Sequence, residues 1–541
     1  MISSSGHQPS QGPATETSWL LGRDDAASTP VETLCASGTY NRRYAELDST
    51  ATSTIIKQEA RLIIRSSIPV ILTYTLQYSF SLVSLLVVGH IGPDELAAAA
   101  LANMALVVIV FSPGIGLASA LDTVCSTTFT ASDDKTLVGF HLQRGLIAIA
   151  CHVLAIVPVM WNLDLALMWL QQDTAVSLLC GQYVRVQMLG VLPWLFFECV
   201  KRFLQAQAIM HASTCILLAV VPVHLLSNYV LVWSAHAGIG FLGAAVANVL
   251  TNWLILLGIV VYAWRSKARE AWGGWTTQAL WSMPQYFKLA IPSMFMICAE
   301  WWILDLLALA ASYLGSTTLA AQSIVINTCS LTYQVPDGLS VVVCNHVGNL
   351  IGQTRARRAR HAAWLGLAMG AAVGVATLCA ALAVGSWWGR IYSDDAQVVA
   401  CVAMIMPACA LFQMFDAVNS VGSGVLRSIE RQNIGALINF PAYYMLGFPL
   451  GLYLTYGSPH VGVLGLWYGI CAGVALAVAM QLLICVRTDW DNEVRRCMVR
   501  VSMDRSALER GRKPGDSDDL TGASSSNGSS SAVSRRSSAS A

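Results

Sequence analysis

The chain has 541 residues, of which 55% are hydrophobic and only 12% are charged. Soluble domains carry about 25% charged residues, so the composition excludes a soluble enzyme. The net charge of +1 argues against a nucleic-acid binder. The first 30 residues hold no apolar stretch of the kind a cleaved signal peptide needs.

Polar tails flank the apolar part of the chain. Residues 1–60 are rich in Ser and Thr, and residues 501–541 are rich in Ser. Such segments cannot bury enough apolar area to fold alone. The sequence therefore predicts a disordered N-tail over 1–60 and a mostly disordered C-tail over 491–541. Within the C-tail, residues 505–541 are expected to have no apolar surface that docks on the rest of the chain.

Twelve apolar stretches lie between the tails. Each is close to the roughly 20 residues that a membrane-spanning helix needs. The predicted spans are 66–90, 97–121, 142–162, 175–200, 210–234, 239–264, 288–312, 318–345, 363–388, 397–422, 434–456 and 461–486. The expected fold is an all-α polytopic membrane protein embedded in a lipid bilayer.

Basic residues are distributed unequally between the two sides of these spans. Only Arg390 lies on one side. The other side holds Lys135, Arg144, Lys201, Arg202, Arg265, Lys267, Arg269, Lys288, Arg355, Arg357, Arg358, Arg360, Arg427 and Arg431. Because basic residues favour the cytosolic side, both termini are expected in the cytosol.

The two halves of the chain resemble each other. Ile68-Pro69 recurs as Ile291-Pro292, and Pro113 as Pro336, both at an offset of 223 residues. An even number of spans per repeat gives the halves one orientation, so we expect two pseudo-symmetric six-helix lobes: an N-lobe over 61–280 and a C-lobe over 281–490. Duplicated lobes around a cavity usually mean alternating access; an old duplication without present mechanistic meaning is the other interpretation.

The chain lacks the motifs of ATP-driven pumps and of metalloenzymes. There is no GxxxxGK[ST], no HExxH and no histidine cluster at helical spacing. We therefore expect no enzyme, no cofactor and no metal site. A secondary transporter remains, with an ion gradient as its energy source, or a channel.

Three acidic residues stand out in predicted spans seven and ten. Glu300 and Asp305 lie in span seven, and Asp416 lies in span ten. An Asp at the centre of a membrane helix costs about 2.5–3.5 kcal/mol, and no basic residue near the middle of either span can pair with these acids. Such a carboxylate binds a proton or a cationic ligand, which is the requirement for proton–cation exchange. A protonated structural acid is the alternative; for Asp122, Glu198 and Asp337 a structural role is favoured.

Aromatic residues accompany the acids, and their rings attract organic cations. Gln77 occupies the repeat position that corresponds to Glu300. The candidate cavity residues are Gln77, Trp301, Trp302, Tyr333, Phe412, Tyr443 and Tyr444.

Several stretches resemble the eukaryotic branch of the multidrug and toxic compound extrusion (MATE) family. They include VVGHIGPDELAAAALANM, IPSMFMICAEWW and QVPDGLSVVVCNHVGN. The resemblance implies a twelve-helix, two-lobe exporter that exchanges protons for organic cations, with Glu300, Asp305 and Asp416 in the C-lobe cavity. The chain departs from the family pattern, which usually has Gly-Gln at Ser126-Thr127, Glu at Asp305 and Arg at His346.

The sequence thus predicts a proton-coupled exporter of small organic cations or xenobiotics, expected as a monomer. A sodium-coupled exporter or a lipid-linked flippase of the same superfold is the alternative. In the N-tail, Glu16, Leu20 and Leu21 resemble an acidic-dileucine sorting signal. The signal would add a vacuolar or endosomal pool to the plasma-membrane one, unless the motif occurs by chance.

Overall fold

The computed structural model describes residues 52–234, 238–458 and 460–509, and within these ranges the chain is helical without strands. Most spans are single helices: α3 (Thr52–Gly89), α6 (Thr136–Trp161), α8 (Thr174–Ala206), α9 (Ala212–Trp233), α10 (Phe241–Arg265), α12 (Met283–Ser312), α13 (Ser316–Gly352), α14 (Ala356–Trp388), α15 (Ala396–Ser428) and α18 (Val463–Arg487). Two spans contain a π-helical turn: α4 (Pro93–Ala105), η2 (Leu106–Phe111) and α5 (Ser112–Ala131) form one, and α16 (Gln432–Phe440), η5 (Pro441–Gly447) and α17 (Phe448–Tyr456) form the other. The remaining elements are α7 (Leu163–Trp169), η3 (Lys267–Ala271), α11 (Gln278–Trp281), η4 (Gly389–Ile391) and α19 (Trp490–Glu509).

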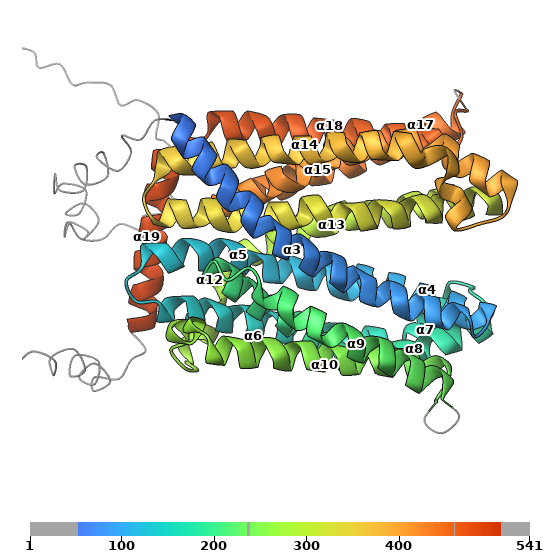
Figure 1. Ribbon diagram of the computed structural model, residues 1–541, viewed down its shortest axis with the longest axis horizontal. Helices are drawn as coiled ribbons and strands as arrows, with labels where there is room; N and C mark the ends of the chain where they lie inside the picture. The colour runs from blue at the N-terminus through green and yellow to red at the C-terminus, as the bar shows by residue number, and fades with distance from the viewer. Residues whose placement is uncertain (1–51, 235–237, 459, 510–541) are drawn as a thin grey trace, which may run out of the picture. The chain divides into compact units, whose positions relative to one another are not determined.

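Each of the twelve predicted spans coincides with a helix or a joined set of helices in the described ranges, and these run side by side along one direction (Figure 1). Ten of the described helices or joined helices are long and apolar enough to cross a membrane. The other two spans have visible reasons for a weaker signal. α13 carries polar side chains such as Gln322, Gln334 and Asp337, and the span α16–α17 is interrupted where Pro441 opens the π-helical turn.

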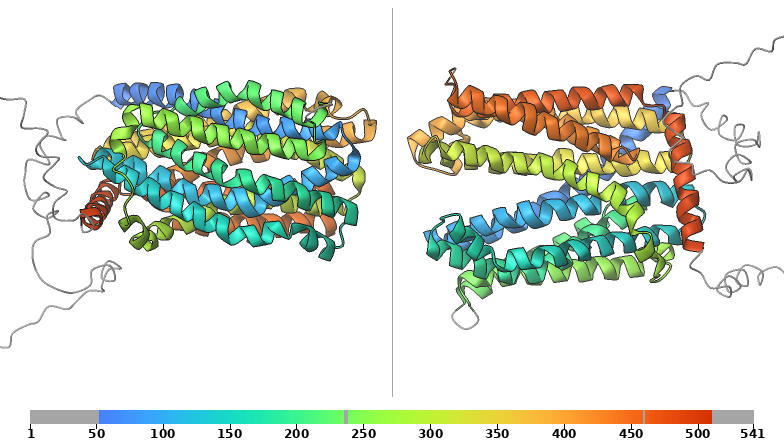
Figure 2. Two further views of the ribbon diagram at one scale, coloured as in Figure 1. Left: turned by 90° about the horizontal axis from the view of Figure 1, so that it is seen from below. Right: turned by 180° about the vertical axis from the view of Figure 1, so that it is seen from behind.

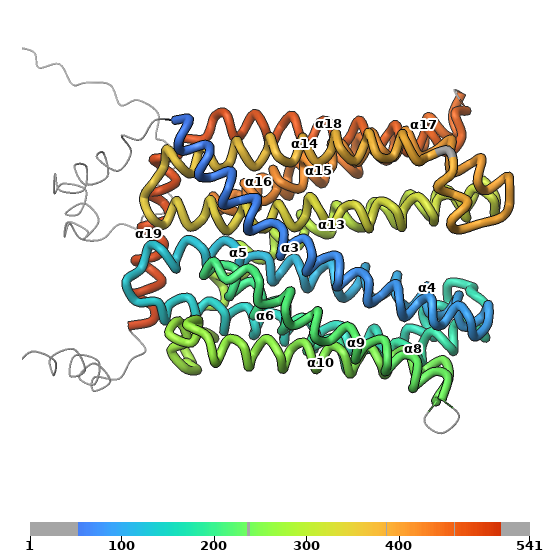
Figure 3. Tube along the Cα trace, viewed as in Figure 1, coloured from blue at the N-terminus to red at the C-terminus, as the bar shows by residue number. Residues whose placement is uncertain are grey.

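The first helix of each half packs partly on the other half. Ile63 and Val70 of α3 belong to a core cluster formed mainly by α13, α14 and α15. Met283 and Tyr286 of α12 belong to the core of the first half, where the Tyr286 hydroxyl donates to the Leu117 carbonyl. Figure 3 shows α3 crossing obliquely from one group of helices to the other. Residues in the N-terminal part of α3 and of α12 therefore pack on the opposite lobe.

The predicted disordered tails were too long. Residues 52–60 are part of α3, and residues 490–509 form α19. In α19, Val494, Cys497, Val501 and Leu508 are buried along one face, which is the spacing of an amphipathic helix. Because the other faces of α19 carry many charged residues, the composition of the segment is polar overall. An interpretation from composition therefore missed the apolar face. The C-tail therefore docks on the rest of the chain as far as Leu508, which lies within the range 505–541 that was expected not to dock.

Helix α19 lies across the ends of helices from both halves (Figures 1 and 2). Asp504 pairs with Arg144 of α6 at 3.1 Å, and Arg500 pairs with Glu430, just after α15, at 2.5 Å. Burial alone would raise the pKa of Asp504, but His141, Arg144 and Arg500 outweigh it and hold that pKa below its usual value. Away from α19, the two groups of helices spread apart (Figure 2).

Candidate functional site: two adjoining cavities between the halves

The larger cavity has a volume of about 370 Å³ and is lined by residues of α3, α4, η2, α12, α13, α14 and α15. It brings together six of the residues predicted from the sequence. They are Glu300, Trp301, Asp305, Tyr333, Phe412 and Asp416. No Lys, Arg or His stands among its described lining residues. We call this cavity the acidic chamber.

The acids of the acidic chamber come from two helices. Glu300 and Asp305 lie five residues apart on α12, and both are half-buried. The Tyr333 hydroxyl of α13 donates to Glu300 Oε1 at 2.6 Å. Asp416 of α15 is 6% exposed, and its Oδ1 has no hydrogen-bond partner among the described residues. The chamber therefore offers negative charge, or protonatable oxygen, without a fixed cation.

A second cavity of about 210 Å³ adjoins the first, because both are lined by residues such as Tyr78, Trp301 and Tyr333. Carboxamides are the most numerous polar groups in its lining. The amides are Gln77, Asn103, Gln187, Asn248, Asn252 and Gln334, and the carboxylates are Glu198 and Asp337. We call it the amide chamber. Uncharged amides donate and accept hydrogen bonds, so this chamber suits neutral polar groups.

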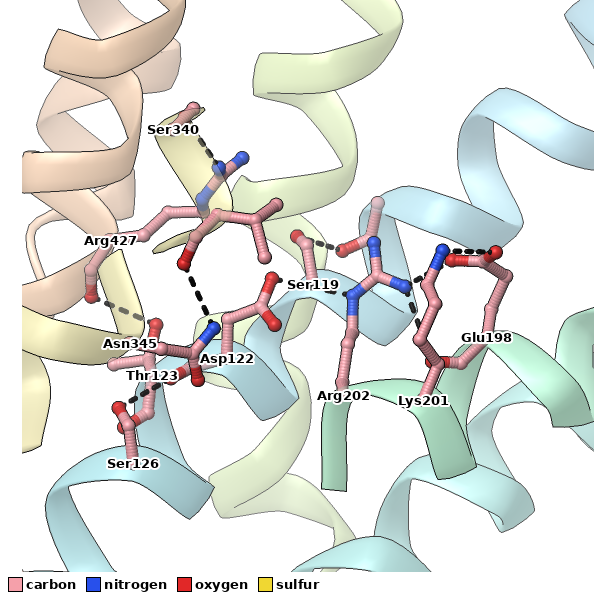
Figure 4. Close-up of polar contacts among 12 residues, drawn as sticks. Ser119, Asp122, Thr123, Ser126, Glu198, Lys201, Arg202, Ser340, Asn345 and Arg427 are labelled. Atoms are coloured by element: carbon pink, nitrogen blue, oxygen red, sulfur yellow. Dashed lines mark hydrogen bonds and ion pairs between the residues drawn. The ribbon is translucent and has the colours of Figure 1, made fainter. Parts of the chain in front are cut away.

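A buried ion cluster holds the wall of the amide chamber. Glu198 Oε1 accepts from Lys201 at 2.6 Å and from Gln77 at 2.8 Å. Its other oxygen pairs with Arg202, whose Nε lies 3.3 Å from Asp122 Oδ2 (Figure 4). All four charged residues are at most 2% exposed. The opposite charges compensate one another, as buried ions must.

The sequence interpretation missed this cluster. It counted Lys201, Arg202, Arg144 and Arg427 among the basic residues of loops and helix ends. All four are buried. The spacing of Glu198, Lys201 and Arg202 on one helix, three and four residues apart, could have indicated the pairing. A structural role for Glu198 and Asp122 agrees with the contacts found.

Four predicted cavity residues lie elsewhere than expected. Gln77 lines the amide chamber and contacts Glu198 rather than the acidic chamber. The Trp302 indole donates to Ser112 Oγ at 2.9 Å and packs against η2 and α5. Tyr443 is 1% exposed and its hydroxyl accepts from Asn419, while the Tyr444 hydroxyl donates to the Ala299 carbonyl. Trp302, Tyr443 and Tyr444 are absent from the described lining of either chamber. Their hydrogen bonds join one helix to another instead. Aromatic side chains with a polar end suit such contacts as well as they suit ligands.

A family model described as MatE matches residues 69–230 and again residues 292–453. The two matches begin 223 residues apart, the offset of the internal repeat. The chain belongs to the MATE family. Its two lobes are the duplicated halves that the family model matches separately.

Relatives of this MATE protein include named transporters from fungi and animals. An uncharacterized transporter of Schizosaccharomyces pombe, C4B3.13, is 37% identical over 437 residues, which cover 81% of each chain. Multidrug and toxin extrusion protein 2 of Mus musculus is 31% identical over 84% of this chain and 78% of its own. The crystal structure of the eukaryotic MATE transporter AtDTX14 superposes with a TM-score of 0.78 at 26% identity, covering 83% of this chain and 100% of that chain. The protein is therefore a multi-pass membrane transporter of the multidrug and toxin extrusion type.

Of the four residues at which this MATE protein departs from the family pattern, Ser126, Thr127 and His346 have specific contacts. Ser126 Oγ donates to the Asp122 carbonyl, and Thr127 Oγ1 accepts from Arg500 of α19 at 2.5 Å. His346 Nε2 contacts Glu59 Oε2 at 2.5 Å, which ties α13 to the start of α3. Asp305 lines the acidic chamber. The sorting residues Glu16, Leu20 and Leu21 lie outside the described residues.

Proposed function

We propose that the protein exports organic cations in exchange for protons by alternating access, using the acidic chamber as the shared site. The observation that carries this proposal is a cavity with three carboxylates and no basic residue in its described lining. A carboxylate in such surroundings is neutral when protonated and attracts a cation when ionised. One site can then hold either a proton or a cationic substrate, but not both.

The chemistry of the lining supports cations rather than anions as substrates. Trp301 and Phe412 offer aromatic faces to a cation. The hydrogen bond from Tyr333 holds the Glu300 carboxylate in a fixed position in the chamber. Glu300 is proposed as the main exchange site, with Asp305 and Asp416 adding attraction for the cation.

The membrane orientation is part of the proposal. The basic residues that predicted the cytosolic side lie on the side of α19, so we place that end in the cytosol. The helices spread apart at the other end, so the structure would be closed toward the cytosol. A monomer is sufficient for this mechanism, and the membrane would be the plasma membrane or that of a vacuole or endosome.

Transport by purified protein in vesicles tests the proposal. Wild type should move a fluorescent organic cation uphill after a pH jump, and a protonophore should abolish the movement. Glu300→Gln keeps the size of the side chain but cannot ionise, so we expect normal abundance and loss of pH-driven exchange, at least tenfold. Asp394→Asn, at an exposed loop position, is the matched control.

Two results would contradict the proposal. Uphill movement by Glu300→Gln at the wild-type rate would make Glu300 a structural acid. Movement that follows a sodium gradient and ignores pH would support the sodium-coupled alternative instead.

The location can be tested separately. Imaging of a Leu20→Ala, Leu21→Ala variant should show loss of the vacuolar or endosomal pool if the dileucine motif sorts the protein. An unchanged distribution would show that the motif is inert.

A further inference from the structure

A third, small cavity of about 30 Å³ lies where both halves meet. A water molecule needs roughly 10–15 Å³ of such volume, so there is room for about two. Its lining comes from α3, α5, α8, α12, α13 and α15. The polar members that matter here are Asp122, Arg202, Glu300, Tyr333, Asp337 and Arg427. The cavity thus joins the main acid of the acidic chamber to residues near the ion cluster.

Asp337 is the carboxylate of this cavity that no other part of the fold uses. It is half-buried, and no hydrogen bond or ion pair joins it to another described residue. It lies one helical turn after Tyr333 on α13, so the two side chains project from the same face of that helix. Asp337 lines both the small cavity and the amide chamber.

Arg427 is the matching cation. It is 5% exposed, it donates to Ser340 Oγ at 3.1 Å, and its Nε has no hydrogen-bond partner among the described residues. No carboxylate of the described chain lies within ion-pair distance of it. A buried arginine and a half-buried aspartate that line one cavity with room for water are joined most simply through that water.

Charged and titratable groups face Asp337 from every side. Tyr74 comes from α3, Asp122 from α5, Lys201 and Arg202 from α8, Glu300 from α12 and Arg427 from α15. The Tyr74 hydroxyl is buried without a hydrogen-bond partner among the described residues. The three cations favour a charged carboxylate at Asp337, while Asp122 and Glu300 oppose it. Asp337 is therefore placed to accept a proton without leaving the surrounding charge strongly unbalanced.

We propose that the proton of Glu300 leaves the acidic chamber through the small cavity, with Asp337 as its first acceptor. This proposal rests on the proposed function. The Glu300 carboxyl gives its proton to a water molecule, and that water passes a proton to the Asp337 carboxylate. One O–H bond breaks at Glu300 and one forms at Asp337, so the charge of the pair is conserved. The ionised Glu300 then attracts the cationic substrate, while Asp337 holds the proton on the α19 side.

Asp337 is thus a proton acceptor in the exchange and does not contact the substrate in this scheme. The purely structural alternative is that Asp337 only balances the charge of Arg427. The two roles differ in their dependence on pH and on added acids, because a counter-ion is needed equally under all conditions, whereas a proton acceptor matters when proton release limits the rate.

The test uses full-length protein in vesicles at saturating substrate. We expect Asp337→Asn to bind the cation with wild-type affinity, but to exchange it about tenfold more slowly, with an altered pH profile. Added formate, a small weak acid, should restore part of the rate, and Asp337→Glu should keep most of it. Asp394→Asn, which changes an exposed acid, is the matched control.

A second variant does not alter any charge. Ser420 lines the small cavity and is 3% exposed, so Ser420→Val would exclude water by adding apolar bulk. We expect Ser420→Val to slow exchange without changing substrate affinity. Formate can carry a proton only where the cavity has room for it. It should therefore restore less of the exchange rate in Ser420→Val than in Asp337→Asn.

Three outcomes would overturn the inference. One is a wild-type rate and pH profile in both variants. Another is a loss in Asp337→Asn that is the same at every pH and that formate does not relieve, which would leave Asp337 as a counter-ion only. The third is failure of Asp337→Asn to fold together with wild-type exchange by Ser420→Val. If wild type itself shows no proton-driven exchange, the proposed function fails. If Glu300→Gln loses exchange but Asp337→Asn does not, only this inference fails.

Discussion

The amide chamber and the acidic chamber each contain a buried carboxylate, Glu198 in the first and Asp416 in the second, and the surroundings of these two acids differ. In the amide chamber Glu198 is bound by Lys201, Arg202 and Gln77. In the acidic chamber Asp416 has an oxygen with no hydrogen-bond partner among the described residues, and no cation stands in the described lining. Glu198 and Asp416 line two cavities with shared walls, and they therefore differ in whether the acid already has its partners.

This difference separates stability from function. A buried acid that is paired stabilises the arrangement of its helices, and its removal strands the partner charges. A buried acid without a partner costs stability and persists where a ligand or a proton uses it. Acids of the first kind should be sensitive in unfolding experiments, and acids of the second kind in transport experiments.

The largest expected effect is on stability, at Glu198. Glu198→Ala removes the carboxylate that two buried cations share, so we expect a loss of about 3–5 kcal/mol of stability. Thermal unfolding of the detergent-solubilised protein measures it, with Asp416→Ala as the control from the other chamber. Equal unfolding temperatures for the two variants would show that the chambers do not differ in this way.

The next effect is on transport, at Asp416. Asp416→Asn removes a negative charge without stranding a cation, so the unfolding temperature should stay close to that of wild type. Cation exchange should fall about tenfold, which corresponds to about 1.4 kcal/mol of interaction energy. Initial rates over a range of substrate concentrations measure it; a stability loss as large as that of Glu198→Ala would place Asp416 among the structural acids.

A double variant sharpens the comparison. Glu198→Met with Lys201→Met replaces one acid and one cation by apolar side chains and leaves Arg202 with Asp122. Exchange of a buried ion pair for apolar groups is often close to neutral, so the double variant should lie within about 1 kcal/mol of wild type. If it unfolds as easily as Glu198→Ala, the cluster contributes more than charge balance.

The smallest effect concerns pH at the α19 end. The pKa of Asp504 is lowered in the folded protein, so its stabilising contribution is complete above the unfolded value of about 3.9. It is lost only as the pH falls through the still lower folded value. Hydrogen exchange of residues 490–509, compared at equal intrinsic rates, should therefore show no change in protection between pH 8 and pH 5. A loss of protection in that window would assign the attachment to another group.

The spans were predictable from the sequence because a membrane helix must be apolar along its whole length. The acidic chamber was predictable in part for a similar reason. Glu300, Asp305 and Asp416 stand out in apolar spans, and Glu300 and Asp305 share a chamber although they lie about 140° apart around α12. The internal offset of 223 residues predicted the two lobes.

The rest depends on contacts between distant segments. The ion cluster needs Asp122 of α5 beside Arg202 of α8, which no spacing reveals. Tyr443 and Trp302 are of the residue types that often line cavities. Their hydrogen bonds to other helices, which the sequence does not reveal, show that they join helices. The end of α19 was missed because its apolar face is visible only at helical spacing among charged residues.

Helix α19 joins α6 through Asp504 and the segment after α15 through Arg500. Those partners belong to different lobes, so the lobes cannot separate at this end unless one set of contacts breaks. In the proposed cycle, α19 must therefore detach from one lobe each time the transporter opens toward the cytosol. A spectroscopic label at Met503, which is 60% exposed, would follow turnover from outside the substrate path and report each opening as it happens.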